Sequence, residues 1–419
     1  MGRSGPEGKP FQIPKQLVWE AYKQVKANKG AAGADGQSIE DFEADLRNNL
    51  YKIWNRMSSG TYFPPPVRAV EIPKPHGGGT RMLGIPTVAD RVAQTAAALA
   101  LEPRTESIFH DDSYGYRPGR SPLMAVAKCR ERCWKKDWVI DLDVRKFFDS
   151  VDHDLMVKAV EANITQEQRW VVLYVKRWLK APVLMPDGRL AERDRGTPQG
   201  SAVSPVLANL FMHYAFDSWL EREFPAVEFE RFADDAVVHC ATERQARQVL
   251  EALGQRMAQV GLALHPDKTK VVYCKDRKRR LEHEHTSFTF LGYTFRVRKA
   301  PTRDGTSMFA AFLPAVSRDA LKKMGGEVRR WRINLRTTSD LGELARWMNP
   351  VIRGWMSYYG RFYRTELHGL LRRINTYLVR WARRKFKRLR AFKRARRWWN
   401  GLLHRQPALF AHWTWMTEF

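Results

Sequence analysis

Three aspartates could hold divalent cations if the fold brings them together: Asp143, and the adjacent pair Asp234 and Asp235 further along the chain. Carboxylate oxygens are the ligands that hard cations such as Mg²⁺ prefer. Two such cations, about 3.5–4 Å apart, activate the attacking oxygen and stabilise the leaving oxygen in phosphoryl transfer. An Asp-Asp pair is weak evidence by itself, because Asp111-Asp112 is a second one and we assign it no metal role. The prediction depends on the elements that would carry Asp143 and the pair to one place.

Strand periodicity would position all three carboxylates. In residues 137–144, DWVIDLDV, apolar side chains alternate, so that Asp141 and Asp143 share one face. A carboxylate on a buried strand is costly unless a partner compensates it, and a metal ion would do so. Asp141 is an alternative ligand. Residues 227–240, VEFERFADDAVVHC, predict a hairpin with Asp234-Asp235 at or near its turn, and such a strand and hairpin can converge three carboxylates.

Capping residues and apolar spacing predict the surrounding elements. One helix begins after the capping-box pair Ser38 and Asp41 and continues to about residue 57, with apolar residues every three or four positions. The remaining predictions are a strand at 67–73, a helix from Thr87 toward Glu102-Pro103, a helix from Ser204-Pro205 with Tyr214 in its apolar stripe, and helices from about residue 318 onward.

The charge of the chain favours a nucleic-acid partner. There are 72 Lys+Arg against 45 Asp+Glu, a net charge of +27, which attracts polyanions. An apolar run long enough to cross a bilayer is missing and residues 1–10 lack a signal-peptide pattern, so we expect no membrane partner and a cytoplasmic, nucleoid-associated protein. The cysteines are too few for a disulfide scaffold; we expect Cys129 and Cys133 to be buried thiols.

The C-terminal part of the chain is unusually basic. Residues 380–397 hold 11 Lys or Arg and no acid, with aromatic residues between them, a pattern that suits a nucleic-acid backbone. We predict a domain boundary where the composition shifts, near 300–318. The expected domains are an N-terminal extension with the start of the next domain (1–66), a central domain (67–300) and a basic helical domain (301–419).

Several motifs, in one order, resemble those of group II intron-encoded reverse transcriptases over about residues 20–413. The motifs are VEIPKPHGGGTRMLGIPTVADR (70–91), YGYRPGRSPLMAV (114–126), WVIDLDVRKFFDSVDHD (138–154), RGTPQGSAVSPVLANLF (195–211), RFADDAVV (231–238), GLALHPDKTKVVY (261–273), FTFLGYTFRVR (288–298), RGWMSYYGRFYR (353–364) and INTYLVRWARRKFKRLR (374–390). The resemblance implies an α+β right-hand polymerase, with fingers and an antiparallel palm sheet, followed by an α-helical thumb or maturase domain.

The resemblance also implies roles for individual residues. Asp143, Asp234 and Asp235 would hold two Mg²⁺ ions, and Val144 would lend its backbone carbonyl. The implied nucleotide contacts are Lys74 and Arg81 on the triphosphate, Gln199 in the nucleotide pocket, and Phe148 as a ring that excludes a ribose 2′-OH. The predicted nucleic-acid contacts are Lys268, Arg380, Arg383, Arg384, Lys385, Lys387, Arg388, Arg390, Lys393 and Arg394. The chain departs from the family at Phe232, where Tyr is usual, and at Ser201, where Gly is commoner.

The implied function is an RNA-directed DNA polymerase that adds dNTPs to a DNA or RNA primer on an RNA template. A second implied role is that of a maturase, which assists splicing and mobility of its own group II intron RNA. The alternatives are a domesticated or CRISPR-associated relative, a retron or diversity-generating enzyme, and a splicing factor with an inactive polymerase, which the three aspartates argue against. Because no cysteine follows Cys274, we expect no nuclease domain with paired C-x-x-C metal clips.

Overall fold

A computed structural model describes residues 8–73, 79–302 and 304–419, so the predicted nucleotide contact Lys74 lies outside the described residues. The chain divides into two compact units. The first consists of Met1–Ala125 with Ile140–Lys270, and the second of Val126–Val139 with Val271–Phe419. The domain boundary predicted near 300–318 remains a prediction.

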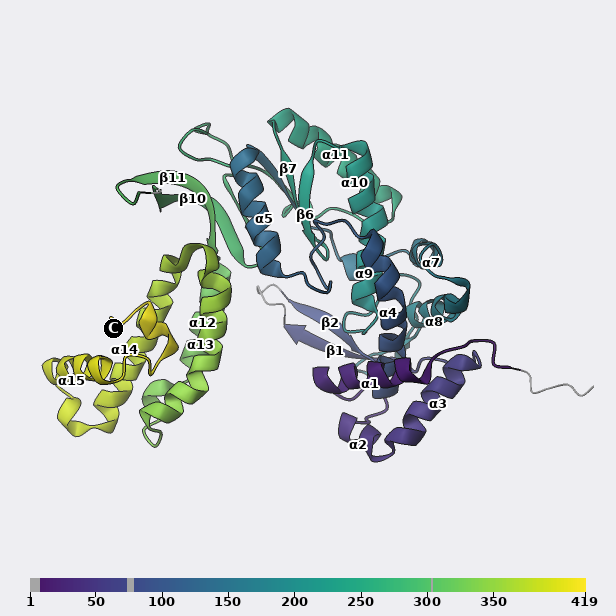
Figure 1. Cartoon of the computed structure of the whole chain (residues 1–419), viewed down its shortest axis with the longest axis horizontal. Coiled ribbons are helices and arrows are strands. Elements are labelled where there is room, and N and C mark those ends of the chain that lie inside the picture. Colours follow the sequence, from purple (N-terminus) through teal and green to yellow (C-terminus); the bar gives the residue numbers. More distant parts are fainter. Residues whose placement is uncertain (1–7, 74–78, 303) are drawn as a thin grey trace, which may run out of the picture. The chain divides into compact units, whose positions relative to one another are not determined.

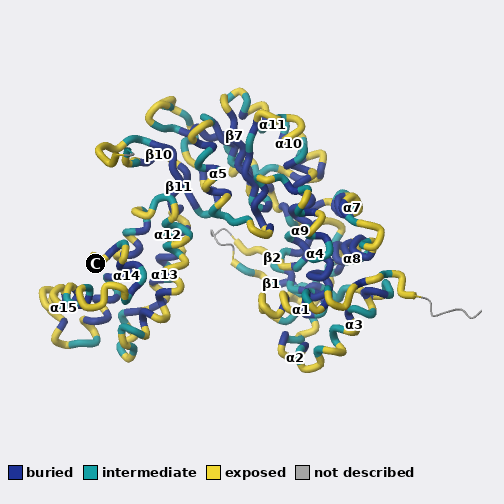
Figure 2. The backbone as a smooth tube through the Cα atoms, viewed as in Figure 1, coloured by how far each residue is buried: buried dark blue, intermediate teal, exposed yellow. Residues whose placement is uncertain are grey.

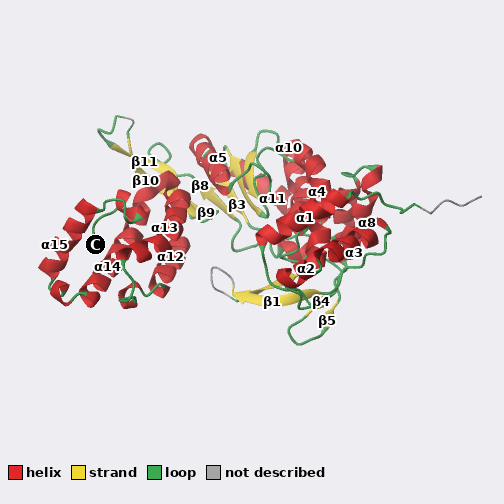
Figure 3. Ribbon diagram, turned by 60° about the horizontal axis from the view of Figure 1, so that its bottom comes forward, coloured by secondary structure: helices red, strands yellow, loops and turns green. Residues whose placement is uncertain are grey.

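Helices and two small sheets build the first unit (Figures 1 and 3). Its helices are α1 (Lys15–Asn28), α2 (Ile39–Ala44), α3 (Leu46–Ser58), α4 (Val88–Ile108), α6 (Phe147–Ser150), α7 (His153–Glu161), α8 (Arg169–Leu179), α9 (Ser204–Met212), a π-helical turn (His213–Asp217), α10 (Ser218–Glu223) and α11 (Glu243–Gln259). Its strands are β1 (Val67–Pro73), β2 (Thr80–Ile85), β4 (Val183–Leu184), β5 (Leu190–Ala191), β6 (Glu228–Phe232) and β7 (Asp235–Cys240). The chain passes between the units in α5 (Pro122–Lys135), β3 (Trp138–Leu142) and β8 (Lys270–Tyr273).

Helix α4 forms the centre of this unit because its sequence is rich in alanine and valine. Val92, Ala93, Ala96 and Ala97 are fully buried, and Figure 2 shows this helix largely in dark blue. Small buried side chains let neighbouring helices approach closely. The side chain of Thr87 accepts a hydrogen bond from the Asp90 amide, which confirms the predicted start. The helix continues past its predicted end at Pro103 to Ile108.

Two four-stranded sheets carry the predicted site residues. One has the order β2-β1-β4-β5, and in it β1 and β2 run antiparallel with Ile72 opposite Arg81. The other has the order β6-β7-β3-β8, and β6 and β7 form a hairpin that ends at the pair Phe232↔Asp235. The predicted strand at 67–73 and the predicted hairpin are therefore confirmed.

The second unit combines a three-stranded sheet with a helical bundle (Figure 1). Its strands β9 (Ser287–Phe290), β10 (Tyr293–Pro301) and β11 (Met308–Val316) pair in the order β11-β10-β9. Its helices are α12 (Arg318–Arg330), α13 (Leu341–Tyr363), α14 (His368–Lys385) and α15 (Phe392–Arg405). Helix α12 begins at the predicted place, and the mixture of sheets and helices confirms the α+β class.

The C-terminal segment folds back on this bundle. Phe410, Trp413 and Met416 belong to the same buried core as the helices, and Trp415 packs against it. Asn375 of α14 fixes the segment, since its amide nitrogen donates to the carbonyls of Met416 and Glu418. Its amide oxygen is 2.6 Å from Nε2 of His412, and burial lowers the pKa of His412 to about 3.

Three helix predictions need correction. The helix expected from Ser38 to about residue 57 is divided at Asp45, where φ is −128°, into α2 and α3. Tyr214 is exposed and is not part of an apolar stripe, because the π-helical turn changes the helical register there. The basic run 380–397 is interrupted at Phe386, whose backbone is extended.

Among the described residues, no helix combines the length and the apolarity needed to cross a membrane.

Candidate active site

The three predicted carboxylates are brought together at the end of the β6–β7 hairpin. Asp143 is the residue immediately after β3, Asp234 lies in the hairpin turn, and Asp235 is the first residue of β7. Burial, followed by the charge of Asp234 and then that of Asp143, raises the pKa of Asp235 to about 7. Burial and the charge of Asp143 also raise the pKa of Asp234. Mutual repulsion of this kind means that the carboxylates share one electrostatic environment.

Asp141 belongs to the same environment. Burial, followed by the charges of Asp235 and Asp143, raises its pKa to about 7, although Lys270 acts in the opposite direction. Crowded carboxylates that repel one another provide hard oxygen ligands whose charge a divalent cation would neutralise. The donor set therefore fits a divalent metal site, with Asp141 as a neighbour of the ligands or an alternative to one of them.

The segment 263–269 fixes the backbone around Asp143. The Asp143 carbonyl accepts from the His265 amide at 2.8 Å, and the Arg145 amide donates to the Ala263 carbonyl at 2.8 Å. Val144 and Leu264 lie opposite each other in an antiparallel bridge, whose two hydrogen bonds are made by the residues on either side of them. The Val144 carbonyl therefore faces away from segment 263–265. This orientation is the one that a backbone metal ligand at Val144 requires.

Two residues of segment 263–269 also contact Asp143 through their side chains. The Lys268 ammonium donates to the Asp143 carboxylate at 3.0 Å, so the predicted site residue Lys268 lies beside the carboxylates. The Thr269 hydroxyl accepts from the Asp143 amide and lies 3.3 Å from its carbonyl oxygen. Thr269 was missed in the sequence because nothing in its local pattern indicates a partner so distant in the chain.

Phe148 is held in place by the loop that precedes Gln199. The Phe148 carbonyl accepts from the Thr197 amide at 2.7 Å. Gly196 has φ of +78°, and a Cβ there would lie 2.7 Å from the Phe148 carbonyl oxygen, so glycine is needed for this approach. The Phe148 ring packs edge-on against Phe147, with ring centres 5.3 Å apart. Phe148 is half-buried, whereas Phe147 belongs to the core.

Gln199 is attached to the strand that carries Arg81. The Gly84 amide of β2 donates to the Gln199 carbonyl at 2.7 Å. A Cβ at Gly84 would lie 2.8 Å from Val67, and one at Gly200 would lie 2.6 Å from the Gly84 carbonyl. Because both glycines permit this contact, the loop with Gln199 packs directly against the strand with Arg81.

Ser201, where the family usually has glycine, is accommodated by a buried network. Its hydroxyl donates to the Gln94 side chain at 2.7 Å, and the Gln94 amide donates to Asp90 at 2.9 Å. Asp90 is fully buried and also accepts from Tyr62 and Trp178. The serine therefore adds a hydrogen bond that attaches the Gln199 loop to α4.

Tyr116 is a second site residue that the sequence did not reveal. Burial and the charges of Asp234 and Asp235 raise its pKa, while Arg81 lowers it, so Arg81 and the carboxylates act on one hydroxyl. Its ring centre lies 6.1 Å from that of Phe232. The Tyr116 ring therefore lies beside Phe232, at the position where the family usually has tyrosine.

The predicted nucleic-acid contacts lie on the second unit, apart from Lys268. The exposed members are Arg380, Arg383, Arg384, Lys387, Arg388, Arg390, Lys393 and Arg394, while Lys385 is half-buried. Arg383 donates to the Arg390 carbonyl and Lys385 to the Ser339 carbonyl, so these two also serve the fold. Trp381 and Trp399 are core residues, so their rings are not available to stack on bases.

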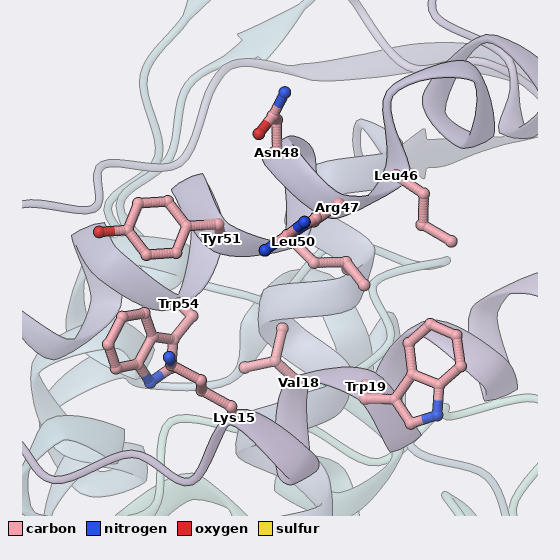
Figure 4. A pocket seen from close by; sticks show the side chains of 9 residues that line it. All are labelled: Lys15, Val18, Trp19, Leu46, Arg47, Asn48, Leu50, Tyr51 and Trp54. Carbon is pink, nitrogen blue, oxygen red and sulfur yellow. The ribbon is translucent and has the colours of Figure 1, made fainter.

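A separate pocket of about 920 Å³ lies between α1 and α3 (Figure 4). It is lined by Lys15, Val18, Trp19, Leu46, Arg47, Asn48, Leu50, Tyr51 and Trp54. Trp19 and Tyr51 are 40% and 55% exposed, so their rings are open to a ligand. The Lys15 ammonium lies 4.5 Å from the centre of the Trp54 ring. Aromatic rings beside cations suit unpaired nucleotides.

Comparisons with known proteins agree with this geometry. The family described as "Reverse transcriptase (RNA-dependent DNA polymerase)" matches residues 72–295, and "Group II intron, maturase-specific domain" matches residues 321–399. The chain is 31% identical to Protein YkfC of Escherichia coli over 70% of its own length and 84% of that protein. It is 30% identical to the group II intron-encoded protein LtrA of Lactococcus lactis, over 60% of its own length and 42% of LtrA.

A yeast relative, the putative COX1/OXI3 intron 2 protein of Saccharomyces cerevisiae, is 30% identical over 50% of this chain and 24% of that protein. The chain thus spans less than half the length of two of these three relatives. The reverse transcriptase match alone covers more than half of the chain, and it contains the carboxylates, Arg81, Phe148 and Gln199. The chain belongs to the reverse transcriptase family, in the branch that carries a group II intron maturase-specific domain.

Proposed function

We propose that this protein copies RNA into DNA by adding dNTPs to a primer 3′-OH at the site formed by Asp143, Asp234 and Asp235. The observation that carries the proposal is the position of Asp143, whose charge raises the pKa of both Asp234 and Asp235 in the hairpin. Two Mg²⁺ ions, when bound, would activate the attacking hydroxyl and stabilise the leaving oxygen. The Val144 carbonyl and the three carboxylates would hold them.

The residues around the carboxylates would bind and orient the nucleotide. Arg81 offers a fork of donors to the triphosphate, together with Lys74. Gln199 shapes the wall of the pocket, and the Phe148 ring occupies the space that a ribose 2′-OH would need. Lys268, which pairs with Asp143 at 3.0 Å, would keep the local charge balanced as cations and phosphates exchange.

We propose a second role in binding intron RNA, which would assist its splicing and mobility at the bacterial nucleoid. The exposed cations of α14 and α15 would contact the phosphate backbone, and the pocket between α1 and α3 would accept unpaired bases. The maturase-specific match and the exposed rings of Trp19 and Tyr51 support this role.

The polymerase is tested by Asp234→Asn and Asp235→Asn. Each change removes a negative ligand and keeps the shape of the side chain, so primer extension on a poly(rA) template should be lost. The affinity for RNA should stay within a few-fold of the wild type, because the basic surfaces are intact. Extension at the wild-type rate by both variants would contradict the assignment.

The RNA role is tested separately by Trp19→Ala combined with Tyr51→Ala. Base–aromatic stacking contributes about 1–3 kcal/mol per base, so affinity for structured intron RNA should fall at least about tenfold. Extension of a saturating poly(rA)/oligo(dT) duplex should be unchanged. As a control, Phe63→Ala removes a ring that is 69% exposed, more than Trp19 or Tyr51, outside this pocket, and it should leave RNA affinity unaltered.

A further inference from the structure

A fully buried arginine lies two residues before the catalytic turn. Both Arg231 and its partner Asp217 have side chains with 0% exposure. The Arg231 Nε donates to Asp217 Oδ1 at 2.7 Å, and Nη2 donates to Asp217 Oδ2 at 2.6 Å, a bidentate pair. The remaining N–H groups donate to Ser113, to Asn209 and to the carbonyl of Ala233. All five guanidinium donors are therefore used.

The Ala233 carbonyl is part of the peptide bond between Ala233 and Asp234, within the turn. Ala233 has φ of +59°, a left-handed conformation that is unfavourable for a residue with a Cβ. Arg231 Nη1 donates to this carbonyl at 2.8 Å and so opposes relaxation of the turn. On the other side, a Cβ at Gly115 would lie 2.4 Å from the Ala233 amide nitrogen, so the backbone at 115 packs directly on the turn.

The main chain of Arg231 reinforces this arrangement. Its amide donates to the Asp112 carbonyl at 2.9 Å, and its carbonyl accepts from the Tyr114 amide at 2.8 Å. Asn209 of α9 donates to the Gly115 carbonyl and accepts from Arg231, so it connects segment 112–115 to the hairpin. Segment 112–115, α9 and the hairpin are thereby held together by the main chain and side chain of Arg231, with Asn209.

The π-helical turn explains how Asp217 reaches this arginine. In an uninterrupted α-helix, eight residues span about 800°, so residue 217 would lie about 80° around the axis from Asn209. A wider turn rotates the chain less per residue and reduces this offset. The turn at His213–Asp217 therefore allows Asp217 and Asn209 to bind the same guanidinium.

We propose that Arg231 is the positioning residue of the catalytic turn, and that the π-helical turn exists to supply its partner Asp217. Arg231 does not touch the reacting atoms. It holds the Ala233 carbonyl, and thereby the orientation of Asp234 and Asp235 toward the metal ions. This inference rests on the proposed polymerase function, and it identifies the residue that sets the geometry of the catalytic turn.

The test separates positioning from stability. Removing only one partner, in Arg231→Met or Asp217→Leu, strands a buried charge and should lower both the melting temperature and activity. The double variant Arg231→Met/Asp217→Leu removes both charges and fills the space with apolar groups, which restores stability in many buried ion pairs. It leaves the Ala233 carbonyl without its donor.

The double variant should therefore melt well above either single variant, although below the wild type, because the Asn209 and Ala233 oxygens lose their donor. It should remain defective in catalysis. Its kcat for primer extension should fall on the order of 10- to 100-fold, as expected for a small misplacement of catalytic groups. The dNTP KM should change less than about twofold, because Arg81 and Gln199 are not touched. Mn²⁺ binding to the enzyme without substrate, followed by electron paramagnetic resonance, should weaken in parallel with kcat.

A matched control is available on the same hairpin. Glu230 and His239 form a second buried pair on this hairpin, 2.6 Å apart with 0% exposure. Glu230→Gln should lower the melting temperature while kcat and Mn²⁺ affinity stay at wild-type values. A loss of kcat in this control as large as that in the double variant would contradict positioning by Arg231.

The outcomes distinguish this inference from the function on which it rests. Wild-type protein that neither binds Mn²⁺ nor extends primers would contradict the proposed polymerase. A double variant with restored melting temperature, kcat and Mn²⁺ affinity would show that the pair is only structural. If the double variant does not fold, Arg231→Lys takes its place, since one ammonium cannot reproduce the five-donor geometry; normal kcat and Mn²⁺ affinity in that variant would overturn the proposal.

Discussion

Crowding of carboxylates makes the metal-free site electrostatically unfavourable. The pKa of Asp235 is raised to about 7, first by burial and then by Asp234 and Asp143. An acid with a raised pKa in the folded state stabilises the fold below its unfolded pKa, near 4, and this stabilisation is lost as the pH rises through about 7. Metal ions reverse the effect, because they bind the ionised carboxylates.

We therefore predict that Asp235→Asn raises the melting temperature in EDTA at pH 8 and leaves it nearly unchanged at pH 4.5. Although protein atoms surround Asp235, solvent still reaches this residue. Salt therefore screens part of the repulsion, and the scans should be made at low ionic strength. Adding Mg²⁺ at pH 8 should stabilise the wild type more than the variant. A variant that is less stable than wild type at pH 8 in EDTA would contradict the electrostatic account.

The two neighbouring phenylalanines allow a direct test of sugar selection. Phe148 is half-buried and fixed by Thr197, whereas Phe147 is a core residue. Phe148→Ala should permit extension with rNTPs alone, since the ring that excludes a 2′-OH is gone. Phe147→Leu should lower stability but still reject rNTPs. Continued rejection by Phe148→Ala would assign the gate to another residue, with Phe147 next to be examined.

Some residues of the site could be found in the sequence and others could not. Asp143 and the Asp234-Asp235 pair follow from strand alternation and a hairpin turn, which are local patterns. Thr269 and Tyr116 act through contacts between segments that are far apart in sequence, and no local pattern specifies such contacts. The role of Arg231 depends likewise on a change of helical register in a different element.

At the level of elements, the helix predictions failed where a break has no sequence signal. Asp45 divides α2 from α3 without proline or glycine, although apolar spacing continues through it. Conversely, Pro103 and Pro350 lie inside helices that continue past them. Tertiary packing decides such cases, because each costs only a few kcal/mol against a large buried surface.

The C-terminal segment depends on one amide for its attachment. Asn375 accepts from Trp413 at 3.0 Å, pairs with His412, and donates to two carbonyls. Asn375→Leu would leave these buried groups without partners, and each such group costs about 1–3 kcal/mol. We expect the unfolding free energy to fall by about 3–5 kcal/mol, measured by urea denaturation.

The exposed Asn400 of α15 gives a control for this substitution. Asn400→Leu makes the same chemical change on a solvated face and should alter the unfolding free energy by less than about 0.5 kcal/mol. In Asn375→Leu, limited proteolysis should cut first after residue 405, before the rest of the bundle is attacked. Equal resistance of this segment in the wild type and in Asn375→Leu would show that other contacts are sufficient to hold it.

Across the whole molecule, the net charge of +27 should control RNA affinity through counterion release. If roughly 6–10 phosphates are contacted, affinity should fall about 10³- to 10⁵-fold between 50 and 200 mM salt. Replacing Arg380, Arg384, Arg388 and Arg394 by Gln should flatten this slope, which filter binding at several salt concentrations measures.

Four other exposed arginines give a control with the same change in net charge. Arg189, Arg222, Arg244 and Arg247 are exposed on the first unit, and three of them pair with a neighbouring acid. Their replacement by Gln should leave the slope within experimental error of the wild type. If both sets flatten the slope equally, net charge alone would account for binding and the α14–α15 surface would have no special role.

The path of the chain has a consequence for exchanging parts between relatives. Residues 126–139 belong to the second unit, although most of that unit follows residue 270. Within this unit the Trp134 indole donates to the Phe312 carbonyl at 3.0 Å, and Arg279 donates to the carbonyls of Cys133 and Lys136. A chimera of two relatives that is joined at a single point near residue 300 would take parts of this unit from different proteins. The contacts between those parts would then be mismatched. Transplanting 126–139 together with 271–419 keeps them matched, so the graft must be cut in two places.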